Sequence, residues 1–314
     1  MSDRPYDLVI IGGGPAGLTA GLYAARARLR AVLLEKMPLP GGLAATTDLI
    51  ENYPGYPQGV SGQELSARMA DQAKRFGLTI VSDQVLSASL KDAPKAITTG
   101  SSRYLAEAVI IASGTQPRRL DIPGEIRLRG KGVSYCATCD GPIFKDKDVA
   151  VIGTGDSGLQ EGFFLSRFAR SISFVEILPH ITGEPILLER LKEKEGVKFY
   201  LNQEITEILG EKRAESVVLK NVTSEEETSL SVQGVFIYVG LEPSTQWLGR
   251  EVELDQAGYV MADGTLQTSV DGVFAAGDVR NKQCRQVATA VGDGALAAYM
   301  AERYLNTVES THDA

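Results

Sequence analysis

Short apolar runs, each ended by a glycine or an acidic residue, recur along the chain and predict buried strands. The first run, residues 8–11, leads through a glycine turn into a helical pattern with small residues on one face, and then into a second run that ends at Glu35. A second copy of this order has apolar runs at residues 149–152 and 172–175, with a helix from about Ser157 between them. Each copy predicts a βαβ unit of the Rossmann type.

Further apolar runs extend both copies in the same way. The run at residues 107–117 breaks on Ser-Gly-Thr, and its counterpart after the second copy is residues 234–240. The last third of the chain adds a strand that runs into Gly277-Asp278 and then a long amphipathic helix, with no third nucleotide motif. We therefore expect this closing element to complete the first domain around an inserted second one.

The predicted fold class is α/β, with two Rossmann-like, three-layer ββα dinucleotide-binding domains. The expected limits are 1–117 and 246–314 for the first domain and 118–245 for the domain inserted into it. Prolines at 117, 123 and 243 suit the linkers, because proline resists continuing a helix or a central strand. Two sequential domains are the alternative, but the closing Gly-Asp element would then belong to no nucleotide-binding domain.

Composition narrows the class of protein. The 314 residues are 43% hydrophobic and 23% charged, which is typical of a globular protein of two domains. No apolar run approaches the ~20 residues that span a bilayer, and the start of the chain has no cleavage-site pattern, so we expect a cytoplasmic protein with no membrane partner. The net charge of -8, with dispersed Lys and Arg, argues against nucleic acid as a partner.

The first glycine motif is Gly12, Gly14 and Gly17, which follow a strand and open a helix. In this context the turn lets the backbone approach a pyrophosphate, and the helix amides bind it. Glu35, eighteen residues after Gly17, is placed at a strand end to accept hydrogen bonds from ribose hydroxyls. A turn used only for packing is the alternative.

The second motif repeats the spacing, because Glu176 again follows the third glycine by eighteen residues; its glycines are Gly153, Gly155 and Gly158. An acid here pairs with a free 2′-hydroxyl and repels a 2′-phosphate, so the motif favours NADH over NADPH. A solvated carboxylate at a strand end is the alternative interpretation of Glu176.

The three cysteines are Cys136, Cys139 and Cys284. A C-x-x-C pair in such a chain indicates redox chemistry or metal binding, and one pair with only two histidines is too few ligands for a structural zinc site. We expect no metal. In a C-x-x-C pair one thiol can have a lowered pKa and attack disulfides, with Asp140 as a proton shuttle. Two buried cysteines without chemistry are the alternative, and Cys284 is expected to be a small buried hydrophobe.

Several motifs together resemble the low-molecular-weight thioredoxin reductases over nearly the whole chain. They are GGGPAG at 12–17, ENYPG at 51–55, IIASG at 110–114, YCATCDG at 135–141, GTGDSG at 153–158, GVFAAGDV at 272–279 and RQV at 285–287. The resemblance implies a homodimeric enzyme with FAD in the discontinuous domain and a nicotinamide nucleotide in the inserted domain. Electrons would pass from nucleotide to flavin, then to the disulfide, then to thioredoxin. The inserted domain would rotate about hinges near 117–124 and 240–243.

The resemblance also assigns site residues. Cys139 would lie nearest the flavin, Cys136 would attack the protein substrate and Asp140 would act as acid. Asn52 and residues 285–287 would lie against the flavin ring. The FAD set is Gly12, Gly14, Pro15, Ala16, Gly17, Glu35, Lys36, Gly42, Leu43, Asn52, Ala112, Gly114, Gly277, Asp278, Arg285, Gln286 and Val287. The set for the second nucleotide is Gly153, Gly155, Asp156, Ser157, Gly158 and Glu176.

Two departures from the family pattern concern the cofactors. Where the family has HRR and a further Arg for the 2′-phosphate, this chain has Glu176, Ile177, Leu178 and then Thr182. Leu43 replaces a polar Gln that commonly follows the glycine pair near the flavin. A flavoenzyme that takes electrons from a ferredoxin-type donor, or holds another adenine dinucleotide such as FAD in the second site, therefore stands beside the NADH-dependent enzyme. A redox-sensing flavoprotein without turnover is the alternative from another class.

Overall fold

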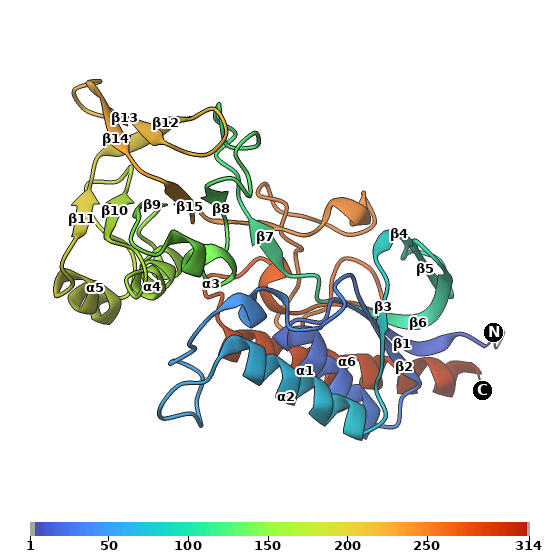
Figure 1. The fold of residues 1–314 in the computed structure, drawn as a ribbon. Coiled ribbons are helices and arrows are strands. Elements are labelled where there is room, and N and C mark those ends of the chain that lie inside the picture. The colour runs from blue at the N-terminus through green and yellow to red at the C-terminus, as the bar shows by residue number, and fades with distance from the viewer. Residues whose placement is uncertain (1–3, 313–314) are drawn as a thin grey trace. The chain divides into compact units, whose positions relative to one another are not determined.

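The computed structural model describes residues 4–312, and the chain forms two compact units. Unit 1 is Met1–Gln116 with Glu242–Ala314, and unit 2 is Pro117–Leu241 (Figure 1). Unit 2 is thus inserted into unit 1 along the chain. The first crossing lies one residue before the expected limit, and the second lies four residues before the expected start at 246.

The parallel strands of the sheet in unit 1 lie in the order β3-β2-β1-β6-β17. Strand β5 pairs with β6, and β4 pairs with β5, both in the antiparallel direction. At its centre Val9 pairs with Val32 on one side and Val109 on the other. The strands are β1 (Tyr6–Ile11), β2 (Ala31–Glu35), β3 (Thr79–Ser82), β4 (Val85–Ser89), β5 (Lys95–Thr99), β6 (Arg103–Ile111) and β17 (Val273–Ala275).

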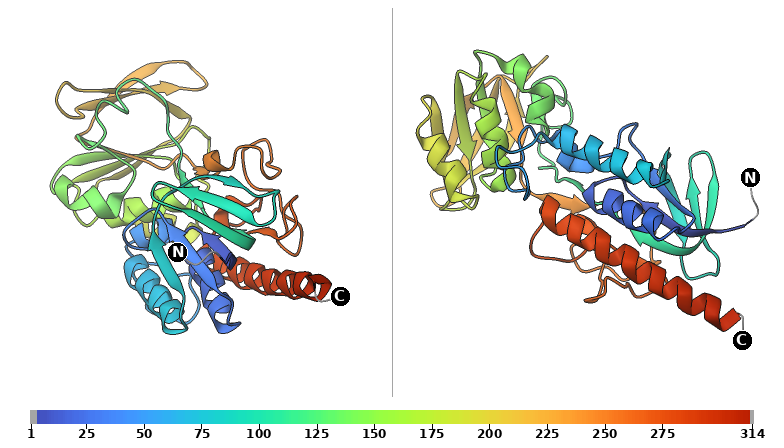
Figure 2. Two further views of the ribbon diagram at one scale, coloured as in Figure 1. Left: turned by 90° about the vertical axis from the view of Figure 1, so that its right-hand side faces the viewer. Right: turned by 90° about the horizontal axis from the view of Figure 1, so that it is seen from below.

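Both faces of this sheet are buried, which explains why its strands are uninterrupted apolar runs. Leu8 and Ile10 of β1 belong to the cluster that includes the helices, while Val9 and Ile11 belong to the cluster on the opposite face. The helices lie along one side of the sheet in Figure 2. They are α1 (Pro15–Arg26), α2 (Gly62–Arg75) and α6 (Val287–His312), and the short 3-10 turns are η1 (Gly42–Thr46), η3 (Gln246–Leu248) and η4 (Gly277–Val279).

Unit 2 repeats the plan with a parallel sheet in the order β11-β10-β9-β15-β8 and a separate antiparallel sheet in the order β12-β13-β14. The strands are β8 (Val133–Ser134), β9 (Asp148–Ile152), β10 (Ser171–Val175), β11 (Val197–Tyr200), β12 (Gln203–Leu209), β13 (Ser216–Asn221), β14 (Glu227–Ser231) and β15 (Gly234–Ile237). The helices are α3 (Ala137–Asp140), α4 (Asp156–Leu165) and α5 (Pro185–Lys192), with a 3-10 turn η2 (Gly141–Phe144).

The parallel sheet of unit 2 also alternates its side chains between two cores. Val149 and Val151 pack with the helices, whereas Ala150 and Ile152 pack with the antiparallel sheet. The α/β class and its three-layer arrangement are therefore confirmed. The run at residues 107–117 breaks at the predicted Ser-Gly-Thr: β6 begins earlier, at Arg103, and ends at Ile111, and Gly114 turns the chain at a φ of 65° before a separate strand β7 (Thr115–Pro117).

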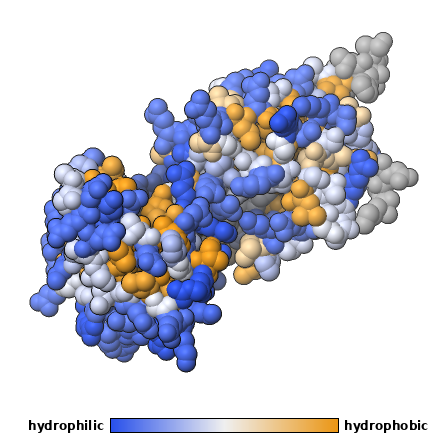
Figure 3. All heavy atoms as spheres, turned by 90° about the horizontal axis from the view of Figure 1, so that it is seen from above, coloured by the Kyte–Doolittle hydropathy of each residue, from blue (hydrophilic) through white to orange (hydrophobic). Residues whose placement is uncertain are grey.

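The two crossings between the units pair with each other. Strand β7 pairs with β16 (Leu241–Pro243), and the Arg118 N–H donates to the Gly240 carbonyl at 3.0 Å. Across residues 4–312, no helix is both long and apolar enough to cross a membrane. The face drawn in Figure 3 is largely hydrophilic, with apolar side chains gathered in small groups between the polar ones.

Candidate active site

The first glycine turn joins β1 to α1, and two of its three glycines leave no room for a side chain. A Cβ on Gly12, which has a φ of 107°, would lie 2.3 Å from the Ala112 carbonyl oxygen, and one on Gly17 would lie 1.9 Å from the Gly12 oxygen. Gly14 is the N-cap of α1 and has open space where its Cβ would be. The backbone is therefore free at the point where a phosphate would approach the helix amides.

Glu35 lies buried at the end of β2 and closes this turn. One carboxylate oxygen accepts the Gly13 N–H at 2.6 Å, and the other accepts the Met37 N–H at 2.9 Å. Each oxygen retains capacity for a further hydrogen bond, so the predicted ribose contact is available. Its role in shaping the turn could not be predicted from the sequence.

Other predicted FAD residues gather around this turn from distant parts of unit 1. A Cβ on Gly42 would lie 3.3 Å from the Gly14 Cα, and one on Gly277 would lie 2.8 Å from the Ala16 Cβ. Pro15 begins α1, Ala112 is buried beside Gly12, Gly114 has open space around it, and Lys36 and Leu43 are exposed.

The residues assigned to the flavin ring also meet within unit 1. The Asn52 amide donates to the Gln286 side chain at 3.2 Å, although the two lie 234 positions apart. Val287 begins α6 and packs against the small cluster that contains Ile50. The Arg285 guanidinium lies 4.0 Å from the centre of the Tyr259 ring.

Asp278 has a buried oxygen, Oδ1, with no hydrogen-bond partner within the described chain. Burial raises the pKa of this carboxyl, and the positive charge of Lys282, 3.4 Å from Oδ1, opposes the shift. Lys282 also contacts Asp293 at 3.1 Å, and Asp293 binds Arg280. An unsatisfied buried acceptor, the open Gly14 backbone and the Glu35 carboxylate together fit a dinucleotide such as FAD. Sequence analysis did not identify Arg280, Lys282 or Asp293.

The second glycine turn, in unit 2, has the same construction. A Cβ on Gly153, with a φ of 101°, would lie 2.2 Å from the Tyr238 carbonyl oxygen, and one on Gly158 would lie 2.1 Å from the Gly153 oxygen. Gly155, the N-cap of α4, has only the Thr182 hydroxyl at 3.9 Å from its Cβ position. This turn therefore also leaves room for a phosphate.

Glu176 is the counterpart of Glu35, and it is only 8% exposed. Its Oε2 accepts from the Thr154 N–H at 2.9 Å and the Thr154 hydroxyl at 2.7 Å, and its Oε1 accepts from the Leu178 N–H at 3.1 Å. The interpretation of Glu176 as a solvated carboxylate is wrong, because the turn needs this acceptor.

The residues around Glu176 offer a nucleotide little positive charge. Ile177 and Leu178 are exposed apolar side chains, 50% and 40% accessible, and Thr182 is also exposed. Asp156 and Ser157 lie exposed at the start of α4, where Asp156 accepts the Glu184 N–H at 3.0 Å. The positions of the family's 2′-phosphate ligands therefore carry no cation.

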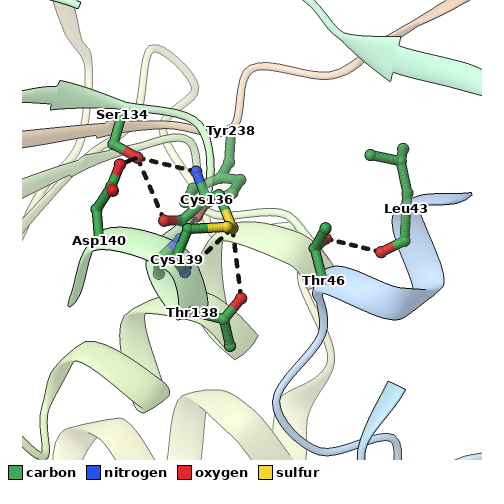
Figure 4. Close-up of a disulfide and its surroundings, with 9 residues drawn as sticks. Leu43, Thr46, Ser134, Cys136, Thr138, Cys139, Asp140 and Tyr238 are labelled. Carbon is green, nitrogen blue, oxygen red and sulfur yellow. Dashed lines mark hydrogen bonds between the residues drawn. A yellow bond between two sulfur atoms is a disulfide. The ribbon is translucent and has the colours of Figure 1, made fainter. Parts of the chain in front are cut away.

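Cys136 and Cys139 form a disulfide at the start of unit 2's first helix, α3 (Figure 4). Cys139 is exposed and Cys136 is half-buried. The Ser134 hydroxyl donates to the Asp140 carboxylate at 2.6 Å and accepts the Cys136 N–H at 3.0 Å. The three predicted catalytic residues are thus brought together, and Ser134, which sequence analysis missed, fixes Asp140 to the cysteine turn.

Two tyrosines support this turn from within unit 2. The Tyr238 hydroxyl accepts the Ala137 N–H at 2.9 Å, and burial, followed by the charge of Glu161, raises its pKa so that the hydroxyl stays protonated. The Tyr135 hydroxyl donates to the fully buried Glu125 at 2.5 Å. Tyr238 lies outside the motifs of the sequence, and although Tyr135 opens the YCATCDG motif, its contact with Glu125 has no local signal in the sequence.

Cys284 is exposed, so the expectation of a small buried hydrophobe is wrong. It lies in the loop before α6, where neighbouring Lys282 takes the buried position between two carboxylates. Within residues 4–312, no three His, Cys, Asp or Glu side chains are grouped so that they could hold a metal ion.

Two dinucleotide turns and one C-x-x-C disulfide in a single chain define a dinucleotide-dependent disulfide oxidoreductase. The family described as pyridine nucleotide-disulphide oxidoreductase matches residues 6–294, and the chain belongs to this family. Membership implies a flavin and a pyridine nucleotide.

Individual relatives cover almost the whole chain. The thioredoxin reductase of Mycolicibacterium smegmatis is 43% identical over 305 residues, which are 97% of this chain and 98% of the relative. The crystal structure of Lactococcus lactis thioredoxin reductase in its FR conformation has 40% identity and a TM-score of 0.94, covering 96% of this chain and 99% of its own. A ferredoxin-flavin thioredoxin reductase from Clostridium acetobutylicum has 27% identity and a TM-score of 0.53, covering 96% and 99%.

Proposed function

We propose that the protein is a flavoprotein disulfide reductase that passes electrons through FAD to the Cys136–Cys139 disulfide and on to thioredoxin or a similar protein disulfide. The observation that carries this proposal is the disulfide itself, because its exposed Cys139 and its fixed acid Asp140 lie in a unit that also has a dinucleotide turn. The names of the relatives support thioredoxin as the partner.

The residues of this chain take distinct parts in the reaction. FAD, when bound, supplies the disulfide with two electrons. The Gly12–Gly17 turn and Glu35 would hold its adenosine half, and Asn52 and Gln286 would lie against its flavin ring. Cys136 attacks the partner disulfide, and Cys139 resolves the mixed disulfide that forms. Asp140, held by Ser134, delivers the proton to the departing thiolate.

NADH is the proposed electron donor in preference to NADPH. The buried Glu176 carboxylate closes the second turn, and a 2′-phosphate would bring a second negative charge to this region. Ile177, Leu178 and Thr182 supply no cation in exchange. Charge-assisted hydrogen bonds are each worth roughly 1.5 to 3 kcal/mol, so losing several weakens NADPH binding by orders of magnitude even after allowance for solvent exposure.

A nicotinamide-independent enzyme is the second candidate, and a specific observation favours it. Glu176 and Glu35 accept equivalent backbone N–H groups from their turns, and Glu176 also accepts the Thr154 hydroxyl, so the second turn could hold the adenosine half of another FAD as well as that of NADH. The similarity to a ferredoxin-flavin thioredoxin reductase supports a ferredoxin-type donor in the same way. A redox sensor without turnover is the candidate from another class.

A homodimer is also proposed, on the basis of apolar side chains on unit 1. Tyr23 of α1 and Leu296 and Tyr299 of α6 are exposed large hydrophobic residues on two helices that pack together. Burying such residues against a second copy would remove them from water. The mass of the protein in solution by light scattering tests this. The cytoplasmic location stays a prediction.

The experiment that tests the proposed function is anaerobic flavin reduction followed by turnover. NADH should bleach the bound flavin much faster than NADPH, and the protein should then reduce thioredoxin in large excess over enzyme. Efficient bleaching by NADPH would contradict the donor assignment, and failure of both nucleotides would favour the nicotinamide-independent enzyme. Failure to turn over thioredoxin with any donor, including reduced ferredoxin, would favour the sensor.

A further inference from the structure

Asp293, near the start of α6, has a largely buried carboxylate, 11% exposed, that accepts four hydrogen bonds. Its Oδ2 accepts the Gly277 N–H at 3.0 Å, the Arg280 Nε–H at 2.9 Å and the Lys282 ammonium at 3.1 Å. Its Oδ1 accepts a second N–H of Arg280 at 3.0 Å. Burial opposes ionisation, but the hydrogen bonds from Arg280 and the charge of Lys282 outweigh it and lower the pKa of this carboxyl. One ionised side chain therefore fastens residues 277–282 to α6.

The donors of these hydrogen bonds lie on both sides of Asp278 in the chain. Gly277 directly precedes it, and Arg280 and Lys282 follow it within the same short segment. The Oδ1 of Asp278 has no hydrogen-bond partner among the described residues, and the Lys282 ammonium lies 3.4 Å from it. Because the chain is held before and after Asp278, the placement of this acceptor depends on Asp293.

The residue after Asp293 fixes the same helix to the first dinucleotide turn. A Cβ on Gly294 would lie 2.2 Å from the Ala16 carbonyl oxygen, so only glycine allows this approach. Ala16 lies in the first turn of α1, which packs against α6 (Figure 1). Gly277 also packs on Ala16, since its own Cβ would lie 2.8 Å from the Ala16 Cβ. Consecutive residues of α6 thus hold the segment that carries Asp278 and the helix that opens from the turn.

We propose that Asp293 is a positioning residue for FAD, which sets the distance between Asp278 and the Gly12–Gly17 turn so that one ligand can meet both. This inference rests on the proposed function. FAD would place its pyrophosphate at the turn and the hydroxyl groups of its ribityl chain at Asp278, so its binding depends on that distance. ADP has the adenosine and the pyrophosphate but lacks the flavin half, so it would use the turn and Glu35 without Asp278. The two ligands therefore separate the positioning of Asp278 from the folding of the turn.

The test compares the binding of FAD and ADP to the full chain from which FAD has been removed. The change in flavin fluorescence on titration gives the dissociation constant for FAD, and competition with FAD gives the constant for ADP at the same site. Asp293→Asn keeps the size of the side chain but removes its charge and replaces one acceptor oxygen by an amide donor. It should weaken FAD binding by about tenfold or more and ADP binding by less than about twofold. Asp71→Asn, on the exposed face of α2, is the charge-matched control and should change neither constant.

Two further variants complete the test. Asp278→Ala removes the acceptor that Asp293 positions, so adding Asp293→Asn to it should weaken FAD binding little further. Arg280→Met removes two of the four hydrogen bonds from a partly exposed side chain, and it should weaken FAD more than ADP even where Asp293→Asn folds poorly.

Equal weakening of FAD and ADP binding by these variants of Asp293 and Arg280 would overturn the inference, as would full additivity of Asp278→Ala and Asp293→Asn. Thioredoxin turnover by the wild type is measured separately. Binding of FAD without turnover would contradict the proposed function and leave this inference standing.

Discussion

Single residues set the electrostatics of the proposed FAD site, and Asp278 is the clearest case. Its carboxylate is largely buried, and its Oδ1 lacks a hydrogen-bond partner among the described residues, while Lys282 holds it together with Asp293. A buried carboxylate without a nearby cation is costly. Lys282 therefore opposes the rise that burial causes in the pKa of Asp278, whose oxygens face the site as acceptors for the hydroxyl groups of a dinucleotide.

Replacing this cation tests its role through stability. Lys282→Met should destabilise unit 1 by about 3 kcal/mol near neutral pH, because it leaves two buried carboxylates with less compensating charge. Loss of the cation raises the Asp278 pKa further above its unfolded value, so the folded protein binds a proton more tightly. The destabilisation should therefore shrink as the pH falls below neutral and Asp278 takes up a proton.

Urea unfolding of the FAD-free protein at several pH values measures this effect. Lys74→Met, on the exposed face of α2, is the matched control, and it should change stability by less than about 0.5 kcal/mol at every pH. A loss for Lys282→Met that is independent of pH would show that packing, not charge, explains the contribution of Lys282.

Among the elements, each of the two strand–turn–helix motifs contains two glycines that the fold requires and one glycine that only ligand binding requires. The first and third glycines of each motif are required by close backbone contact, as at Gly12 and Gly17. The middle glycine has an ordinary extended backbone and open space around it, as at Gly14. A side chain there can be built without a clash, so it should affect the ligand alone.

Matched valine substitutions at the middle glycines should therefore have opposite outcomes. Gly14→Val should fold but weaken FAD binding by about tenfold or more for each amide–phosphate hydrogen bond lost. Gly155→Val should keep its FAD and lose the response of the flavin to NADH. Flavin content after gel filtration and the rate of flavin bleaching measure the two effects. Loss of FAD from Gly155→Val would contradict the assignment of the two turns.

The same elements show how far the sequence could predict the site. The βαβ units were predictable because apolar runs, glycines and the acid spacing are local signals. Ser134, Tyr238 and Lys282 were not, because these residues lie outside every motif and only packing brings them to Asp140, Ala137 and Asp293. The prediction that Cys284 is buried was wrong because a single residue in a loop has no periodic pattern from which its exposure can be predicted.

At the scale of the whole molecule, one chain has places for two redox groups. Unit 1 holds the residues that fit FAD, and unit 2 holds the disulfide and a second dinucleotide turn. Each group stores one pair of electrons, so the protein as a whole should accept electrons in two stages. A chain with flavin alone would accept only the first pair.

An anaerobic reductive titration of the FAD-loaded protein, with thiols counted at the end point, tests this most directly. The wild type should take up about twice as many electron equivalents per flavin as Cys136→Ser/Cys139→Ser, and the added thiols should appear at Cys136 and Cys139 while Cys284 stays unchanged. Equal uptake by the wild type and the double variant would contradict the account, because the disulfide would then lie outside the path of the electrons.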